Sequence, residues 1–327
     1  MLLSTIVKML RLRALVLILL IAVIATLSFG YFPEQNIKHL LTITLLIGLW
    51  YINGTTINDI ADVEIDKINL KNAFGRPLAN KKTSRKSMIS IAVFSAISMI
   101  AISFAINTKL GVVATVGITL NYIYSMPPIK LSHRGVWALL LLPLGYVALP
   151  FSMSYAILQQ SMNTDILLLL ASIYLCFIGR MALKDYRDVV GDKKFNKRTF
   201  LIRYGSDATV VFSSIFFSIG SLIGFYLFFN NYPLMSSIIF GHLLFVLYLL
   251  QKLKKTDQSY SQQVIIGSIA RIATTTLICM ALSLQMPLDV LSTTAIVELL
   301  LIVSLATFGV VSAMHFANNP DQTKVKY

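Results

Sequence analysis

The chain has 327 residues, of which 56% are hydrophobic and only 13% are charged, and its formal net charge is +14. The mean hydropathy is +0.75. The charged fraction is low, because soluble domains carry charge on about 25% of their residues. These values exclude an ordinary soluble domain. Cys176 and Cys279 both lie in apolar runs, which is typical of small core residues in a reducing compartment and not of a disulfide or metal pair.

Ten apolar runs of about 20 residues follow one another along the chain, and each is long enough to cross the core of a bilayer. They lie at about 13–32, 38–57, 87–107, 109–125, 136–157, 165–183, 207–229, 233–251, 264–285 and 290–316. The pattern predicts an all-α polytopic membrane protein. The first run is too long and too rich in Leu and Ile for a cleaved signal peptide.

The basic residues alternate along the chain with the runs. Of the 28 Lys and Arg residues, 24 lie in the two termini and in every second loop, while the opposite side carries only Lys38 and Lys109. The positive-inside rule therefore places both termini on the cytoplasmic side of the cytoplasmic membrane. The positive charge is explained by topology and by attraction to membrane lipids with anionic headgroups, so we expect no nucleic-acid partner.

Seven of the fourteen acidic residues lie in two stretches that repeat after 126 positions. Asp59, Asp62 and Asp66 correspond to Asp185, Asp188 and Asp192, and Glu64 is the seventh. In a helix, acids at this spacing share one face, where their like charges are destabilising unless a cation lies among them. Because carboxylate and amide oxygens suit Mg²⁺, the sequence predicts a Mg²⁺ site on the cytoplasmic side. The candidate ligands are Asn58, Asp59, Asp62, Asp66, Asp185, Asp188 and Asp192.

A basic loop follows each acidic stretch. The loop 67–86 holds seven cations and no acid, and it is either an ordinary positive-inside loop or a cover in which Lys71 and Arg76 bind an anion above the carboxylates. The turn after the fourth run contains Tyr124 and Lys130, which are either membrane anchors or substrate-binding residues. Arg180, inside the sixth run, either contributes to a site or extends to the interface. The four histidines, including His133, are assigned no role.

These motifs resemble those of the UbiA superfamily of intramembrane prenyltransferases. The two acidic stretches carry the resemblance, with support from Arg76-Pro77-Leu78, from residues 124–130 and from Lys197-Arg198-Thr199 with Gly205. It covers residues 8–206 well and the remainder only by hydrophobic pattern. The resemblance implies nine transmembrane helices around a central cavity, so we expect nine to ten. It further implies a single domain over residues 1–327, with repeated halves at about 8–135 and 136–260 and C-terminal helices at 261–327.

The resemblance also implies an activity, namely Mg²⁺-dependent transfer of a polyprenyl group from its diphosphate to a hydrophobic or aromatic acceptor through an allylic carbocation. The implied catalytic residues are Asp62, Asp66, Asp188, Asp192 and Tyr124. The implied diphosphate-binding residues are Lys71, Arg76, Lys130, Lys194 and Arg198. The second motif is similar to the menaquinone, homogentisate, chlorophyll and archaeal ether-lipid branches, which favours a quinone precursor and leaves chlorophyll-type or ether-lipid acceptors as alternatives.

Two other classes compete with this interpretation. A transporter with a cytoplasmic cation site would also have an internal repeat, but transporter sites usually lie near the bilayer midplane. The second class is a non-catalytic scaffold or a CDP-alcohol-type lipid transferase, and the latter would need an acidic motif with different spacing. The predicted position of the acids at the cytoplasmic interface favours the prenyltransferase.

Overall fold

The computed structural model describes residues 11–30, 37–69, 76–285 and 293–318. These residues are nearly all helical, and the one β-type pairing among them is an isolated bridge between Arg134 and Arg198. The chain divides into two compact units. The first comprises Met1–Met162 and Asp188–Arg203, and the second comprises Asn163–Arg187 and Tyr204–Tyr327. The predicted halves, 8–135 and 136–260, stay a prediction.

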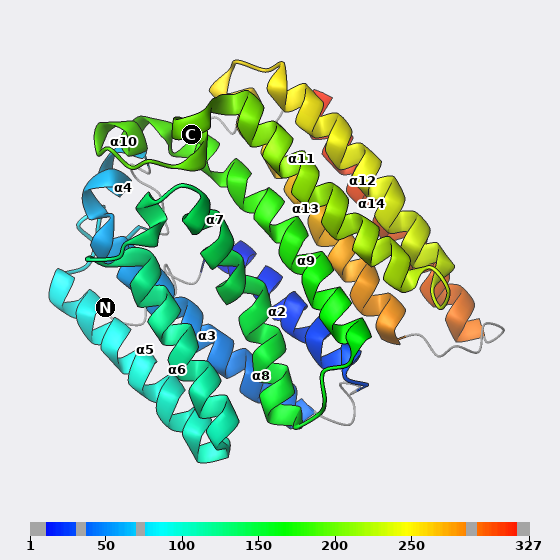
Figure 1. Ribbon diagram of the computed structural model, residues 1–327, viewed down its shortest axis with the longest axis horizontal. Coiled ribbons are helices and arrows are strands. Elements are labelled where there is room, and N and C mark those ends of the chain that lie inside the picture. Colours follow the sequence, from blue (N-terminus) through cyan, green and yellow to red (C-terminus); the bar gives the residue numbers. More distant parts are fainter. Residues whose placement is uncertain (1–10, 31–36, 70–75, 286–292, 319–327) are drawn as a thin grey trace. The chain divides into compact units, whose positions relative to one another are not determined.

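The first unit consists of helices that carry the first five predicted runs and the segment with Asp192. In chain order they are α2 (Leu12–Ser28), α3 (Ile37–Ala61), α4 (Val63–Asn69), α5 (Arg85–Ile106), α6 (Thr108–Ser125), the 3₁₀ turn η1 (Leu131–His133), α7 (Val136–Pro143), the π-helix η2 (Leu144–Ala148), α8 (Leu149–Leu158) and α10 (Val189–Lys194). Figure 1 shows α5 and α6 as an antiparallel hairpin. Asn107 joins them and begins α6, since its Oδ1 accepts a hydrogen bond from the Leu110 amide at 2.8 Å.

The second unit contains the remaining runs. Its elements are α9 (Thr164–Leu183), the 3₁₀ turn η3 (Lys184–Arg187), α11 (Phe200–Phe228), α12 (Pro233–Lys254), α13 (Ser259–Gln285) and α14 (Thr293–Asn318). The first residues of α11 belong to the first unit, and this helix is kinked at Gly205, where φ is +82°. Such a φ is accessible to glycine without steric cost, so the kink falls close to the boundary between the two units.

Within the described residues, all ten predicted runs form helices. Eight segments among the described residues are long and apolar enough to cross a membrane, while α2 is shorter and α6 is interrupted by polar residues. The run 136–157 is the one whose helix is irregular. It changes from α7 to a π-helix directly after Pro143, because proline cannot donate the backbone hydrogen bond that an α-helix needs there.

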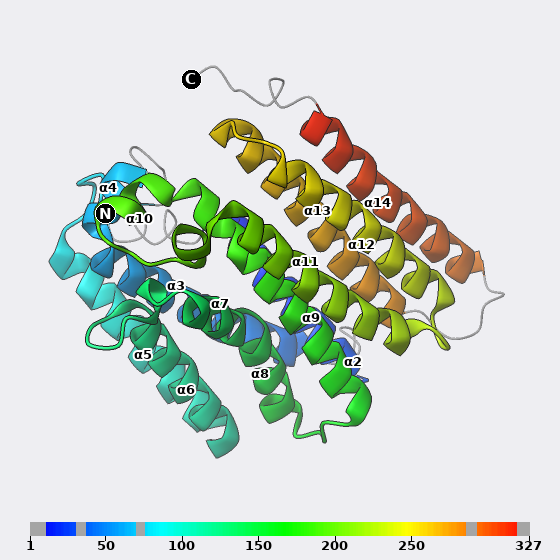
Figure 2. The ribbon, with the colours of Figure 1, turned by 45° about the horizontal axis from the view of Figure 1, so that its top comes forward.

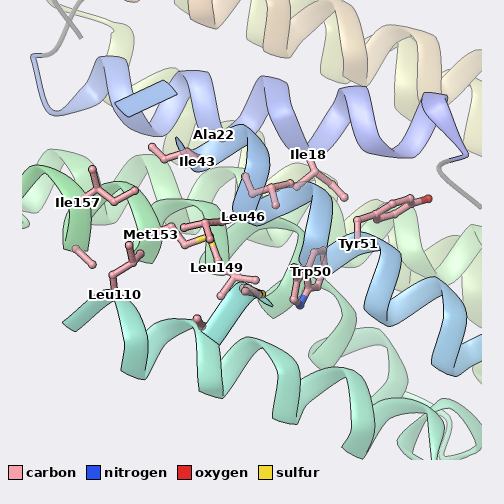
Figure 3. Close-up of a cluster of buried hydrophobic side chains, with 14 residues drawn as sticks. Ile18, Ala22, Ile43, Leu46, Trp50, Tyr51, Leu110, Leu149, Met153 and Ile157 are labelled. Carbon is pink, nitrogen blue, oxygen red and sulfur yellow. The ribbon is translucent and has the colours of Figure 1, made fainter. Parts of the chain in front are cut away.

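The core of the first unit lies between α2, α3, α5, α6 and α8 (Figure 3). Ile18, Leu46, Leu110 and Met153 are all fully buried in this cluster. Trp50 closes it on one side, where its Nε1 donates to the Gly117 carbonyl at 3.1 Å. Helices in lipid gain little from hydrophobic burial against one another, so close packing of this kind must hold them together.

A buried amide pair fixes α3, the helix that carries the first acidic motif, against α5 and α6. Asn121 Nδ2 donates to Asn53 Oδ1 at 3.0 Å and to the Trp50 carbonyl at 3.1 Å, while Asn53 Nδ2 donates to the Ala92 carbonyl at 2.9 Å. Gly54 allows the approach, because a Cβ there would lie 2.7 Å from Asn121 Oδ1. The register of α3 is therefore set well before the chain reaches Asp59.

In the second unit, α12, α13 and α14 run side by side in Figures 1 and 2. His242 is buried among them, with Nδ1 2.7 Å from Thr276 Oγ1 and Nε2 3.3 Å from the Ala306 carbonyl. Arg271 lies over the Phe316 ring, 4.3 Å from its centroid. These contacts place polar side chains between the last helices of the chain.

Candidate active site

The first acidic motif spans the junction between α3 and α4. Asp59 lies in the last turn of α3, Asp62 lies between the helices, and Asp66 lies in α4. The Asp62 amide donates to the Asn58 carbonyl and the Asp66 amide donates to the Asp62 carbonyl, both at 2.9 Å. Helical hydrogen bonding thus continues through the junction. All three carboxylates are buried, with at most 6% of each residue exposed.

Two arginines bind the outer pair of these acids. Arg76, itself largely buried, forms an ion pair with Asp59, and its Nε lies 2.9 Å from Asp66 Oδ2. Arg11 Nη2 lies 2.5 Å from Asp59 Oδ1. Arg76 therefore lies beside the carboxylates, as predicted. Arg11, one of the basic residues near the N-terminus, is part of the same cluster.

Two lysine ammonium groups and one imidazole surround Asp62. Lys130 Nζ lies 3.0 Å from its Oδ1, His133 Nε2 lies 3.6 Å from the same atom, and Lys197 Nζ lies 3.8 Å from Oδ2. Burial by itself would raise the pKa of Asp62, but the neighbouring imidazole and the two ammonium groups outweigh it and lower the pKa to about 2. Asp62 is therefore held as a carboxylate. His133, to which the sequence assigned no role, is partly buried against this acid.

Asp66 behaves in the opposite way. Its burial, together with the negative charges of Asp59 and Asp62, raises its pKa to about 8, even though Arg76 is in contact with it. Across the described residues, the buried Oδ2 of Asp59 accepts no hydrogen bond. Asp59 Oδ2 is thus buried without a hydrogen-bond donor, and Asp66 resists ionisation. Both observations indicate that the cluster can bind a further cation.

The second acidic motif reaches this cluster through α10. Asp192 is buried, and its Oδ1 lies 3.4 Å from Asn69 Nδ2 and 3.5 Å from Lys197 Nζ. Asn69, the last residue of α4, also accepts a hydrogen bond from the Gly191 amide at 2.6 Å. Figures 1 and 2 both show α4 beside α10. Lys197 contacts both Asp62 and Asp192, so part of each motif lies around one ammonium group.

The second motif is not the single helix that its spacing suggested. Residues Lys184–Arg187 form a 3₁₀ turn, and α10 starts at Val189, after Asp188. Asp and Gly are poor helix formers in the interior of a helix, which accounts for the interruption. Asp188 and Asp192 remain one turn apart, and the Asp192 amide donates to the Asp188 carbonyl at 3.0 Å. Asp185 belongs to the second unit, where it is buried with Lys184 Nζ 2.5 Å from its Oδ1.

The other predicted residues are distributed as follows. Asn58 Nδ2 lies 3.4 Å from Asp62 Oδ2. Tyr124 is half-buried near the end of α6, and Lys194 and Arg198 are exposed. Lys71 lies outside the described residues. The structure therefore brings together Asn58, Asp59, Asp62, Asp66, Arg76, Lys130 and Asp192, and it adds Arg11, Asn69, His133 and Lys197. The sequence carried a signal for Lys197, which lies in the Lys197-Arg198-Thr199 motif after the second acidic stretch. For Asn69 the signal was its place directly after the first acidic stretch.

The cluster suits Mg²⁺ by its chemistry. No three Asp, Glu, His or Cys side chains in the ranges described above converge closely enough to hold a metal ion alone. Mg²⁺ does not need such a set, since it keeps several waters and is usually bound by one or two carboxylates and the phosphates of a substrate. The surrounding Arg and Lys residues supply what a phosphate group requires. The arrangement can therefore hold a phosphorylated ligand and a divalent cation together.

Comparison with known proteins places the chain in a family. The model of the UbiA prenyltransferase family matches residues 15–269. The digeranylgeranylglyceryl phosphate synthase of Pyrococcus furiosus is 26% identical over 190 residues, which are 56% of this chain and 64% of that protein. The protein of the same name from Methanococcus aeolicus is 27% identical over 226 residues, covering 68% and 77% of the two chains. Chlorophyll synthase of Arabidopsis thaliana is 26% identical over 188 residues, covering 55% and 47%.

Solved structures agree with this assignment at the level of the fold. A UbiA homologue from Archaeoglobus fulgidus, bound to GPP and Mg²⁺, matches with a TM-score of 0.67 and 17% identity over 86% of this chain and 99% of that one. A UbiA homologue from Aeropyrum pernix matches with a TM-score of 0.56 and 13% identity, over 93% and 99% of the two chains. The resemblance suggested by the paired acidic motifs is confirmed, and the chain belongs to the UbiA prenyltransferase family.

Proposed function

We propose that this protein transfers a prenyl group from a prenyl diphosphate to a lipid-soluble acceptor, with Mg²⁺ as cofactor. The observation that carries the proposal is the position of Lys197, 3.8 Å from Asp62 and 3.5 Å from Asp192, which brings acids of both motifs into one basic cluster. Membership of the prenyltransferase family supports it, as does the Archaeoglobus homologue that binds GPP and Mg²⁺. The transporter and the CDP-alcohol-type transferase have no such support.

In this proposal the acids bind Mg²⁺ and the basic residues bind the diphosphate. The residues that would hold the metal all lie in the first unit, and they are Asn58, Asp59, Asp62, Asp66, Asp188 and Asp192. Mg²⁺, when bound, withdraws negative charge from the diphosphate and makes it a better leaving group. Arg76 and Lys130 are already fixed beside the acids. They would donate to the phosphate oxygens, together with Lys71, Lys194 and Arg198 from the loops.

The reaction then proceeds by ionisation and capture. The bond between the allylic carbon and the diphosphate oxygen breaks, and its electron pair leaves with the diphosphate. Fixed cations stabilise the charge that develops on the leaving group without needing to reorganise. The acceptor attacks the allylic carbocation and loses a proton. Tyr124 would face the reacting carbon, and the apolar helices would keep water from capturing the cation.

Three acceptor classes follow from different observations. The form of the second motif suggested an aromatic or quinone-precursor acceptor. The relatives named digeranylgeranylglyceryl phosphate synthase favour transfer to the hydroxyl group of a glycerol phosphate lipid. The relative named chlorophyll synthase favours transfer to the free carboxyl group of a pigment. We therefore keep the quinone precursor and the glycerol phosphate lipid as the two candidates.

The test is a product assay with the purified full-length protein in detergent. Geranylgeranyl diphosphate and Mg²⁺ are supplied with either 1,4-dihydroxy-2-naphthoate or geranylgeranylglyceryl phosphate, and diphosphate release and lipid products are both measured. We expect diphosphate release that depends on Mg²⁺ and on one acceptor, and EDTA should abolish it. Absence of release with both acceptors and with shorter and longer prenyl donors would refute the proposal.

We further propose that the protein lies in the cytoplasmic membrane with this site on the cytoplasmic side. The high density of Lys and Arg in the segment 76–86 supports it. A cysteine introduced for exposed Lys82 should react with a membrane-impermeant maleimide only after the cells are opened. Labelling in intact cells would place the site on the other side.

A further inference from the structure

A cleft of about 310 Å³ lies on the first unit, and none of the clustered acids lines it. Its walls come from the end of α3, from α4, from the turn that follows Arg76 and from the start of α5. The lining residues are Ile60, Val63, Lys67, Leu78, Lys81, Thr83 and Arg85. Its size is within the range of small-ligand sites. The reaction proposed above assigns no role to any of these side chains.

The cleft combines an apolar interior with a basic rim. Ile60, Val63 and Leu78 provide the apolar surface, while Lys67, Lys81 and Arg85 are exposed cations around it. One of these cations is paired, because Glu64 Oε1 lies 2.6 Å from Lys67 Nζ. An exposed pair of this kind is weak, so the rim keeps an excess of positive charge.

The turn that forms one wall is well ordered by its own hydrogen bonds. The Lys81 amide donates to the Leu78 carbonyl at 3.1 Å, and the Lys82 amide donates to the Pro77 carbonyl at 2.8 Å. Lys81 adopts a left-handed conformation, with φ at +56°, which non-glycine residues adopt only when the surrounding structure requires it. Thr83 Oγ1 is buried in this wall, and no hydrogen-bond partner for it is found in the described part of the chain. The wall therefore presents a fixed cation and a buried hydroxyl group that can still donate.

The cleft opens at the end of a lipid-facing stripe. Arg85 begins α5, and Ile89, Val93 and Ile97 follow it at intervals of four residues, which places them along one side of the helix. These three side chains are between 47% and 63% exposed, and neighbouring Phe94 is 71% exposed. Because α5 is apolar enough to cross the membrane, this stripe faces acyl chains, and Arg85 lies where the headgroups begin.

We propose that this cleft binds an anionic phospholipid. The phosphate group would lie between Lys67, Lys81 and Arg85 and accept a hydrogen bond from Thr83, and the acyl chains would follow the apolar stripe of α5. Basic clusters immediately cytoplasmic of a membrane helix attract anionic lipids. A free phosphate ion would satisfy the cations but would leave the apolar walls and the stripe unused. The proposal is independent of prenyl transfer.

The first test is native mass spectrometry of the full-length protein in detergent with added phosphatidylglycerol or phosphatidylcholine of the same acyl composition. We expect retention of phosphatidylglycerol and about 10- to 30-fold weaker binding after the double substitution Lys81→Ala/Arg85→Ala, which removes two headgroup contacts. The matched control is Lys252→Ala/Lys254→Ala, which removes two cations from the last turn of α12 and should leave most of the binding intact. Equal binding of the two lipids, or equal losses in both variants, would overturn the proposal.

Two further measurements keep the result interpretable. A photoreactive phosphatidylglycerol should label the wild-type chain within residues 78–97. This experiment needs no variant, so it does not depend on the folding of one. Labelling only outside residues 78–97 would count against the cleft. Inorganic phosphate separates the two sources of the anion. If millimolar phosphate displaces phosphatidylglycerol completely, the site takes the free ion and the lipid proposal fails, whereas persistence of the lipid supports it.

Discussion

The contact between Gly191 and Asn69 offers a direct test of how the two acidic motifs are held together. Gly191 lies in α10 and its amide donates to Asn69 Oδ1 at 2.6 Å. A Cβ on Gly191 would lie 2.6 Å from that Oδ1, 2.7 Å from Cγ and 2.8 Å from Nδ2. Optimal contacts between non-bonded carbon atoms are about 3.5–4.0 Å. The substitution Gly191→Ala therefore forces Asn69 and α10 apart by about 1 Å.

The cost follows from two separate effects. Overpacking a close contact costs about 1–3 kcal/mol, and leaving the buried Gly191 amide without its acceptor costs about 1–3 kcal/mol more. Together these predict a loss of about 2–6 kcal/mol in the free energy of unfolding. Because a displacement of about 1 Å can reduce turnover by about 100-fold, prenyl transfer by Gly191→Ala should fall by a similar factor.

The assay is a double-substitution cycle with thermal unfolding in detergent and diphosphate release as readouts. In Asn69→Ala the three atoms that obstruct the new Cβ are absent, so adding Gly191→Ala should cost little beyond Asn69→Ala alone. Gly241→Ala in α12 is the matched control, because its Cβ would meet no atom within 4 Å and alanine is the better helix former. If Gly191→Ala is equally damaging with Asn69 present or removed, the steric reasoning is refuted.

Three further predictions concern the acids and Lys197. Asp188→Ala should reduce turnover to background while leaving the unfolding temperature within a few degrees of wild type, and full activity would exclude Asp188 from the site. Lys197→Met, which keeps the length of the side chain but removes its charge, should reduce turnover by at least about 10-fold, because Asp62 and Asp192 lose their shared cation. Lys197→Arg should restore part of it, and equal activity of all three proteins would show that the bridge is dispensable. In EDTA, the free energy of unfolding should decline as the pH rises from about 4 to about 8. The reason is that the pKa of Asp66 is about 8 in the folded protein but about 3.9 in the unfolded chain. Asp66→Asn should reduce this decline, which is measured as the unfolding temperature against pH, and an unchanged slope would contradict the assignment.

The sequence predicted the helices and the first motif well for identifiable reasons. Apolar runs of about 20 residues can satisfy their backbone hydrogen bonds in a membrane only as helices, and each of the ten became one. The shared face of Asp59, Asp62 and Asp66 depends on spacing alone, and hydrogen bonds through Asn58 and Asp62 preserve that spacing where α3 gives way to α4.

The shape of the second motif and the cations that contact the acids could not be predicted from the spacing of residues along the sequence. The interruption of the second motif between Arg187 and Val189 results from local backbone preferences that a count of spacings ignores. Arg11 meets Asp59 across 48 positions of chain, and Lys197 meets Asp62 across a longer separation. Such pairs arise only when the loops fold over the acids. Composition indicated that these loops are basic, but it could not indicate which of their cations would face inward.

The sharing of Lys197 has a consequence for exchanging parts between members of this family. Because one ammonium group serves carboxylates from both motifs, and Asn69 of one acidic helix holds the other, α4 and the segment from Asp188 to Lys197 form a matched set. A chimaera that takes one of them from a relative while keeping the other would lose this fit even if every acid were retained. Both segments would have to be transplanted together.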